Sequence, residues 1–268
     1  MNDSFDKAVF QDFHIHASGY RTGAGGQMTI DDSMIVEVIV RRAEELGLKS
    51  ICILEHLEPV SGRHPWQESL KVKREVDKIK NNTPLTVFSG CEASIVDLNG
   101  NLSAPDGEIA DAGFDVVIAS FHQMPYEVRS IDEFHDFAIR MMSAAGRNKF
   151  VNILGHPWRD SPKILAKALP GVDWNFGLVP EGHIEEIAKI TSENNVYAEI
   201  SMPAIELDLN YLSFIKKLNK AGAHFSVGSD AHSLTNMKEA DTIFNVLSKT
   251  GISNNKLMGS KNANSHNI

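Results

Sequence analysis

Two pairs of metal-type ligands, each spaced two residues apart, lie near opposite ends of the sequence. His14 and His16 come near the start, and Asp230 and His232 come near the end. Side chains of a β-strand alternate between its two faces, so both members of each pair are expected to point the same way. Two pairs more than 200 residues apart can act on one ion only if a closed fold brings both strand ends together. We therefore expect a metal site built across a barrel.

Seven short apolar segments, rich in Val, Ile and Phe, have the composition of strands that are buried on both faces. They cover residues 9–16, 50–54, 85–91, 115–120, 151–154, 196–200 and 224–227. Amphipathic helices are expected over residues 31–46, 71–80, 131–145, 181–194, 209–221 and 234–247. Alternating strands and helices indicate an α/β fold whose parallel sheet is joined by crossover helices. Because potential ligands follow nearly every strand, closure into a barrel is favoured over an open sheet.

Potential ligands follow six of the seven expected strands. In order along the chain they are His14, His16, Glu55, His56, Glu92, His122, His156, Asp230 and His232. In parallel α/β barrels the rim at the strand carboxyl ends is where active sites are built. Imidazole and carboxylate ligands without a thiolate suit Zn, Mn or Fe in a catalytic site. The set is too large for one ion, so we expect two or three divalent metal ions that share a bridging carboxylate.

Composition fits one globular domain spanning residues 1–268, with a barrel core over about 9–250 and a flexible tail at 256–268. The net charge of −9 argues against a nucleic-acid polymer as partner. Two cysteines are too few for a disulfide framework, so a reducing cytoplasm is the expected location. The N-terminus does not resemble a signal peptide, and no apolar run is long enough to span a membrane. The oligomeric state is not indicated.

The order of these motifs resembles the PHP (polymerase and histidinol phosphatase) family over residues 9–247. The resemblance implies a distorted (β/α)7 barrel, similar to a TIM barrel, and metal-dependent hydrolysis of a phosphoester. It also implies that His14, His16, Glu92 and Asp230 hold one ion, that Glu92 bridges to a second ion held by His122 and His156, and that His56 and His232 belong to a third site.

The chain departs from the family pattern in one loop. Many members carry a further histidine several residues after the HxH motif, whereas residues 17–26 contain none. The third ion could be absent, or it could be held by a substitute such as Glu55 or His64. The sequence leaves two and three ions open.

The expected reaction is hydrolysis of a small phosphomonoester, with histidinol phosphate as one candidate, by a metal-activated hydroxide. Asp230, His56 and His232 are the expected catalytic residues, and either histidine could protonate the leaving oxygen. An arginine near the rim would bind the phosphate through paired N–H groups. Arg159 is the first choice, followed by Arg21 and Arg63.

Three alternatives stay open at this point. A nucleotide or oligonucleotide phosphodiesterase would use the same ligands, although the acidic charge weakens it. A non-catalytic metal-binding regulatory module is favoured only by the missing histidine. Hydrolysis of a C–N bond ranks low, because the lysine that often bridges metals in amidohydrolases has no counterpart here and Glu92 takes its place.

Overall fold

A sequential ring of parallel strands forms the centre of the molecule. The computed structural model describes residues 10–17, 21–22, 28–29, 33–57 and 65–259. Seven strands pair in the order β1-β4-β5-β6-β7-β8-β9, and every pairing is parallel. They are β1 (Gln11–His16), β4 (Ser50–Leu54), β5 (Thr86–Ser94), β6 (Val116–Ser120), β7 (Ile153–Gly155), β8 (Tyr197–Ser201) and β9 (Phe225–Gly228). Sheet order equal to chain order is the topology of a wound β/α barrel.

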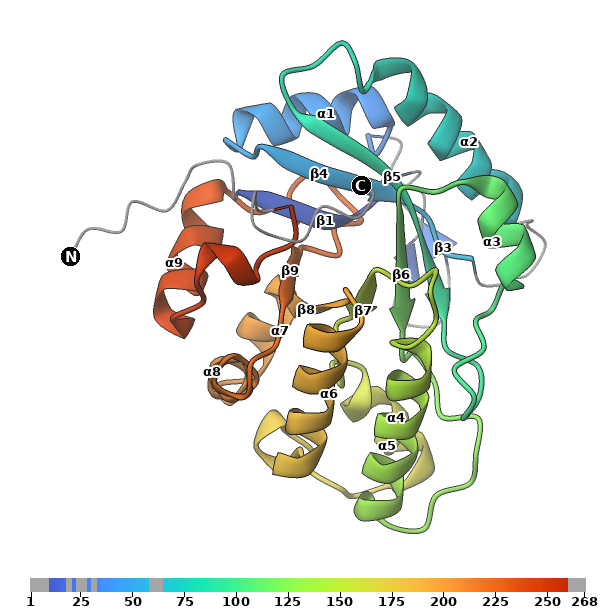
Figure 1. The fold of residues 1–268 in the computed structure, drawn as a ribbon, viewed down its shortest axis with the longest axis vertical. Helices are drawn as coiled ribbons and strands as arrows, with labels where there is room; N and C mark the ends of the chain where they lie inside the picture. The colour runs from blue at the N-terminus through green and yellow to red at the C-terminus, as the bar shows by residue number, and fades with distance from the viewer. Residues whose placement is uncertain (1–9, 18–20, 23–27, 30–32, 58–64, 260–268) are drawn as a thin grey trace.

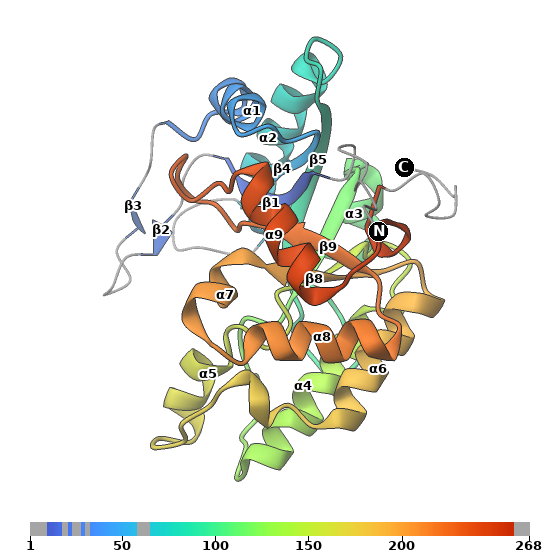
Figure 2. The same cartoon turned by 90° about the vertical axis from the view of Figure 1, so that its left-hand side faces the viewer.

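Helices cover the outside of this ring (Figures 1 and 2). They are α1 (Val36–Glu45), α2 (Pro65–Ile79), α3 (Asp106–Ala112), α4 (Ile131–Ala145), α5 (Ser161–Ala168), α6 (Glu181–Glu193), α7 (Met202–Leu207), α8 (Tyr211–Ala221) and α9 (Ala240–Thr250), with short 3-10 turns η2 (Phe176–Leu178) and η3 (Asn254–Lys256). Helices α4, α6 and α8 lie side by side, while α2 packs on β4 and β5. In the described ranges, no helix combines the length and apolar character needed to cross a bilayer.

The ring is nearly closed by contacts between β1 and the segment that follows β9. Ile15 and Ala231 form a parallel β-bridge, and β1 packs along β9. The predicted (β/α)7 class is therefore confirmed. A separate two-stranded antiparallel ribbon, β2 (Arg21–Thr22) with β3 (Met28–Thr29), stands away from the main sheet (Figure 2).

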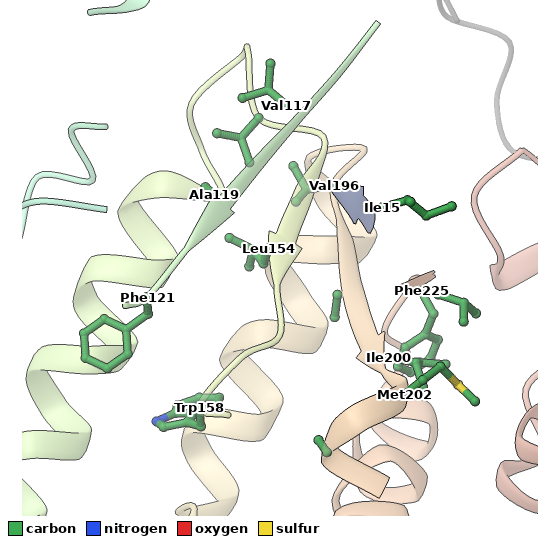
Figure 3. Close-up of a cluster of buried hydrophobic side chains, with 14 of the residues drawn as sticks. Ile15, Val117, Ala119, Phe121, Leu154, Trp158, Val196, Ile200, Met202 and Phe225 are labelled. Atoms are coloured by element: carbon green, nitrogen blue, oxygen red, sulfur yellow. The ribbon is translucent and has the colours of Figure 1, made fainter. Parts of the chain in front are cut away.

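Buried apolar side chains form two layers. The larger cluster fills the space between strands and helices, where Figure 3 shows Ala119, Leu154 and Ile200. A smaller cluster, including Cys52, Ile118 and Tyr197, occupies positions that alternate with the outer layer and so face the barrel interior. Further along the same strands the interior positions become polar. The apolar cluster thus forms a floor beneath the polar end of the barrel.

The structure corrects several expected boundaries. Strand β5 continues through Glu92 to Ser94, so Glu92 lies within the strand. The last predicted helix, 234–247, is observed at Ala240–Thr250, because residues 233–236 form a turn in which Ser233 bonds to Asn236. Helices α3, α5 and α7 were not expected. The start of the predicted tail is packed: Leu257 is fully buried and bridges to β9, and residues 260–268 lie outside the described part of the chain.

Candidate metal centre

The residues predicted as metal ligands converge at the carboxyl ends of the barrel strands. They form four overlapping groups in which one ligand atom from each residue lies within 4.8 Å of the others. Besides the predicted set, the groups contain Glu199 of β8. The converging predicted residues are His14, His16, His56, Glu92, His122, His156, Asp230 and His232.

The bridge between Ile15 and Ala231 positions the two pairs that are spaced two residues apart. Both bridging residues are fully buried in the outer core, so the residues on either side of each face the interior. His16 N donates to Ala231 O at 2.9 Å, and Ala231 N donates to His14 O at 3.3 Å. Asp230 lies beyond the end of β9 and adopts a left-handed φ of 49°. For the second pair, a single bridge and a turn therefore replace the continuous strand that we expected.

The first ligand group joins both ends of the chain. His14 Nε2 and His16 Nε2 are 3.0 Å apart. Each lies 3.4 Å from Glu92 Oε2, and their distances to Asp230 Oδ1 are 3.5 and 3.1 Å. Two imidazole nitrogens and two carboxylate oxygens facing one point match the ligand preference of Zn and similar divalent ions.

The second ligand group uses the other oxygen of the same glutamate. Glu92 Oε1 lies 3.1 Å from His122 Nε2 and 3.1 Å from His156 Nε2. Ser120 Oγ donates to this oxygen at 2.6 Å, and Ser94 Oγ lies 2.8 Å from His122 Nδ1. The carboxylate therefore faces one ligand group with each of its oxygens.

A third group consists of histidines alone. The His16 ring stacks on those of His56 and His232, with centroids 4.3 and 4.1 Å apart. His232 Nδ1 lies 3.0 Å from the Asp230 carbonyl oxygen, so this nitrogen carries the proton and Nε2 carries the lone pair. Because His16 Nε2 already belongs to the first group, only two imidazoles in the described residues are dedicated to a third ion.

The charges and unpartnered oxygens at the site fit a bound cation. Burial opposes ionisation of Glu92, but His14 and His122 outweigh it and hold the pKa of this carboxyl well below its usual value. Burial and the neighbouring His16 lower the pKa of His232 to about 3, so this imidazole is neutral. Glu92 Oε2 and Asp230 Oδ1 are buried, and in the described part of the chain no donor meets hydrogen-bond geometry with either. Ionised carboxylates with unpartnered buried oxygens are donors that divalent ions satisfy.

Arg159, the first predicted phosphate ligand, lies at the edge of the first group. Its Nη1 donates to Asp230 Oδ2 at 2.5 Å, with the two side chains 15% and 14% exposed. Burial opposes its charge, but Asp230 and Asp160 raise the pKa of Arg159 above its usual value, so it stays protonated. For Arg21 the structure describes only the backbone, within β2, and Arg63 lies outside the described residues, as does His64.

Three supporting residues were not assigned to the site from the sequence. Ser94 and Ser120 hold His122 and Glu92, and Glu199 bonds to His14 and to the backbone of His156. The available signal was a polar residue at an interior position of an otherwise apolar strand. Glu55 is buried next to His56, but it is in none of the ligand groups.

The sequence is similar to bacterial proteins that are named probable phosphatases. No family model matches the chain. A probable phosphatase of Thermoanaerobacter sp. (strain X514) is 30% identical over 219 residues, covering 79% of this chain and 78% of the relative. A probable phosphatase of Clostridium novyi (strain NT) is 28% identical over 211 residues, covering 76% and 75%.

The fold is also similar to that of solved structures. Crystal structures of YwqE from Bacillus subtilis and CpsB from Streptococcus pneumoniae, described as unique metal-dependent tyrosine phosphatases, match with a TM-score of 0.53. The identity is 18%, and the match covers 94% of this chain and 89% of the other. At this identity the likeness concerns the barrel alone.

Proposed function

Because the chain belongs to the PHP-like family of these bacterial phosphatases, we propose that it is a phosphomonoesterase that uses two divalent metal ions. The relatives' names support phosphatase activity. The ligand groups support metal dependence, since their donor atoms fit Zn, Mn or Fe.

The position of Glu92 carries the proposal of two ions. Its two oxygens face different ligand groups, with Oε2 toward His14 and His16 and Oε1 toward His122 and His156. Glu92 would therefore help to hold both ions of a two-metal site, the kind of site that many phosphoryl-transfer enzymes use. The third group supports two ions rather than three, because in the described residues it has no third dedicated imidazole. The carboxylate oxygen nearest to it, Glu92 Oε2 at 2.9 Å from His56 Nδ1, already belongs to the first group.

Residues of the chain bind the phosphate and supply the proton for the leaving oxygen. When bound, the ions supply Lewis acidity to the phosphoryl oxygens and to the attacking water. Arg159 positions the phosphate: a guanidinium has five N–H donors, so its bond to Asp230 leaves others for a phosphoryl oxygen. His56 is about a quarter exposed, with a side-chain exposure of 26%, and we assign it to protonate the leaving oxygen. His232 is less suited to that step, because its proton lies on Nδ1, against the Asp230 carbonyl.

Hydrolysis of an aryl phosphate tests this function. Metal-stripped protein is reconstituted separately with manganese, zinc and iron, and wild type is compared with Asp230→Asn. Lys217→Met, which alters an exposed ion pair on α8, is the matched control. We expect turnover that returns with metal, is lost in Asp230→Asn and persists in the control.

A substrate panel then separates the candidates. It includes histidinol phosphate, phosphotyrosine and a bis-aryl phosphodiester. Turnover of the diester alone would replace the phosphomonoesterase proposal with a phosphodiesterase. Absence of turnover with every metal, in folded and metal-loaded protein, would leave a non-catalytic metal-binding module.

A further inference from the structure

Glu199 lies between the two ligand groups rather than within either one. It is an interior residue of β8 and is 2% exposed. Its Oε1 is 2.8 Å from His14 Nδ1, which belongs to the first group through Nε2. Its Oε2 accepts the backbone N–H of His156, from the second group, at 2.5 Å. One carboxylate therefore contacts both groups.

The contact with His14 fixes the tautomer of that imidazole. An ionised carboxylate can only accept hydrogen bonds, so His14 Nδ1 must carry the proton. In the neutral imidazole, Nε2 then carries the lone pair, and this atom lies 3.4 and 3.5 Å from Glu92 Oε2 and Asp230 Oδ1. A carboxylate behind a ligand histidine sets ring orientation and increases ligand basicity.

The contact with His156 acts on backbone rather than on a ring. His156 has φ of 27°, in the left-handed region that non-glycine residues seldom adopt. It is followed by Pro157, which has no N–H. The bond from His156 N to Glu199 therefore anchors the turn that places His156 Nε2 3.1 Å from Glu92 Oε1.

Gly228 provides the space that the Glu199 carboxylate occupies. A Cβ at position 228 would lie 1.7 Å from Glu199 Oε1 and 2.7 Å from His14 Cβ. The φ of Gly228 is not among the positive values, so alanine would meet no backbone strain there. The need for glycine at this position is steric, and it concerns the contact between Glu199 and His14.

We propose that Glu199 is a positioning residue that couples the two ligand groups, setting the His14 ring in the first and the His156 backbone in the second. The inference rests on the proposed metal centre. It predicts that one substitution, at a residue that belongs to neither the first nor the second ligand group, weakens both ions together. A residue that supported one ligand only would weaken one ion.

Metal affinity measured by competition with a chelator tests the coupling. Glu199→Gln keeps the size of the side chain, but its amide oxygen can accept from only one of the two N–H groups, and the charge is lost. We expect both ions to bind about 10- to 100-fold more weakly, as for other residues that support metal ligands. Gly228→Ala should weaken both ions as well, because its Cβ displaces the same carboxylate.

Tyr211→Phe is the matched control for a merely structural effect. The Tyr211 hydroxyl accepts from Ser201 N at 2.7 Å and lies 3.4 Å from the Glu199 carbonyl oxygen, so it supports the same strand end without touching the carboxylate. We expect this variant to melt at lower temperature with both metal affinities within about twofold of wild type. If Glu199→Gln leaves both affinities unchanged, weakens only one ion, or changes them no more than Tyr211→Phe, the coupling is wrong. Because the readout is affinity, failure of the phosphatase proposal would appear separately, as a metal-loaded wild type without turnover.

Discussion

Replacing Arg159 by methionine should destabilise the protein far more without metal than with it. Arg159 donates to Asp230 at 2.5 Å, and both side chains are about 85% buried, with exposures of 15% and 14%. Removing one partner of a buried ion pair leaves the other charge uncompensated, at a cost of about 3–5 kcal/mol. For a chain of 268 residues this corresponds to a melting temperature lower by about 5–9 °C.

Bound metal changes that cost, because the Asp230 carboxylate then has a second source of positive charge. With manganese present we expect the loss to fall to about 1 kcal/mol, the size of a screened surface pair. The stability loss in chelator thus exceeds the loss in manganese by at least about 2 kcal/mol. Because metal binding and folding are thermodynamically linked, Arg159→Met should bind metal about 30-fold more tightly than wild type.

Thermal melts of wild type and Arg159→Met, each in chelator and in excess manganese, provide the assay. Lys217→Met is the control, since its pair with Glu181 is exposed and should be worth no more than about 1 kcal/mol in both conditions. An Arg159→Met loss of the same size in chelator and in manganese would refute the reasoning, because Asp230 would then not be compensated by metal.

Two further outcomes follow from the structure. Ser94→Ala removes the hydroxyl beside His122 Nδ1 and should weaken one metal ion about 10- to 100-fold by chelator competition. Ser89→Ala, earlier in β5, removes a hydroxyl that bonds to Asp115 and should leave metal affinity unchanged. Burial lowers the pKa of His135 to about 4, so as the pH falls the unfolded chain binds this proton before the folded protein does. The free energy of unfolding should therefore decrease between about pH 6.5 and 4, and in His135→Leu this decrease should be smaller by on the order of 3 kcal/mol when measured by urea unfolding. An unchanged pH dependence in the variant would contradict the prediction.

The alternating pattern of strands and helices predicted the barrel because each buried strand is a nearly continuous apolar run. The observed element boundaries differ from the predicted ones where local backbone geometry departs from a regular strand or helix. Between its pairings with Ile51 and Ile53 of β4, strand β1 contains one extra residue, which makes a bulge. Because of this bulge, Phe13 packs in the apolar floor of the barrel while His14 and His16 also face the interior. Helices α3, α5 and α7 have seven, eight and six residues, too few turns for hydrophobic periodicity to reveal.

The types and order of the candidate ligand residues were predictable, since each follows or ends a strand. Their supports were less so, because hydrogen bonds link residues far apart in the sequence. Glu199 reaches His14 across 185 positions, and only the closed barrel shows which imidazole nitrogen it faces. The bond of Arg159 to Asp230 likewise joins residues 71 positions apart. Spacing alone identifies donor atoms but does not show which partner each one meets.

Counting the metal ions per chain tests the central claim most directly. Native mass spectrometry of reconstituted wild type should show two ions. Glu92→Gln should lose at least one, because an amide places an N–H₂ group toward one of the two ligand groups that Glu92 now faces with oxygens. A wild type that binds no ion or a single ion, or a Glu92→Gln variant that retains two ions with unchanged affinity, would contradict a centre bridged by Glu92.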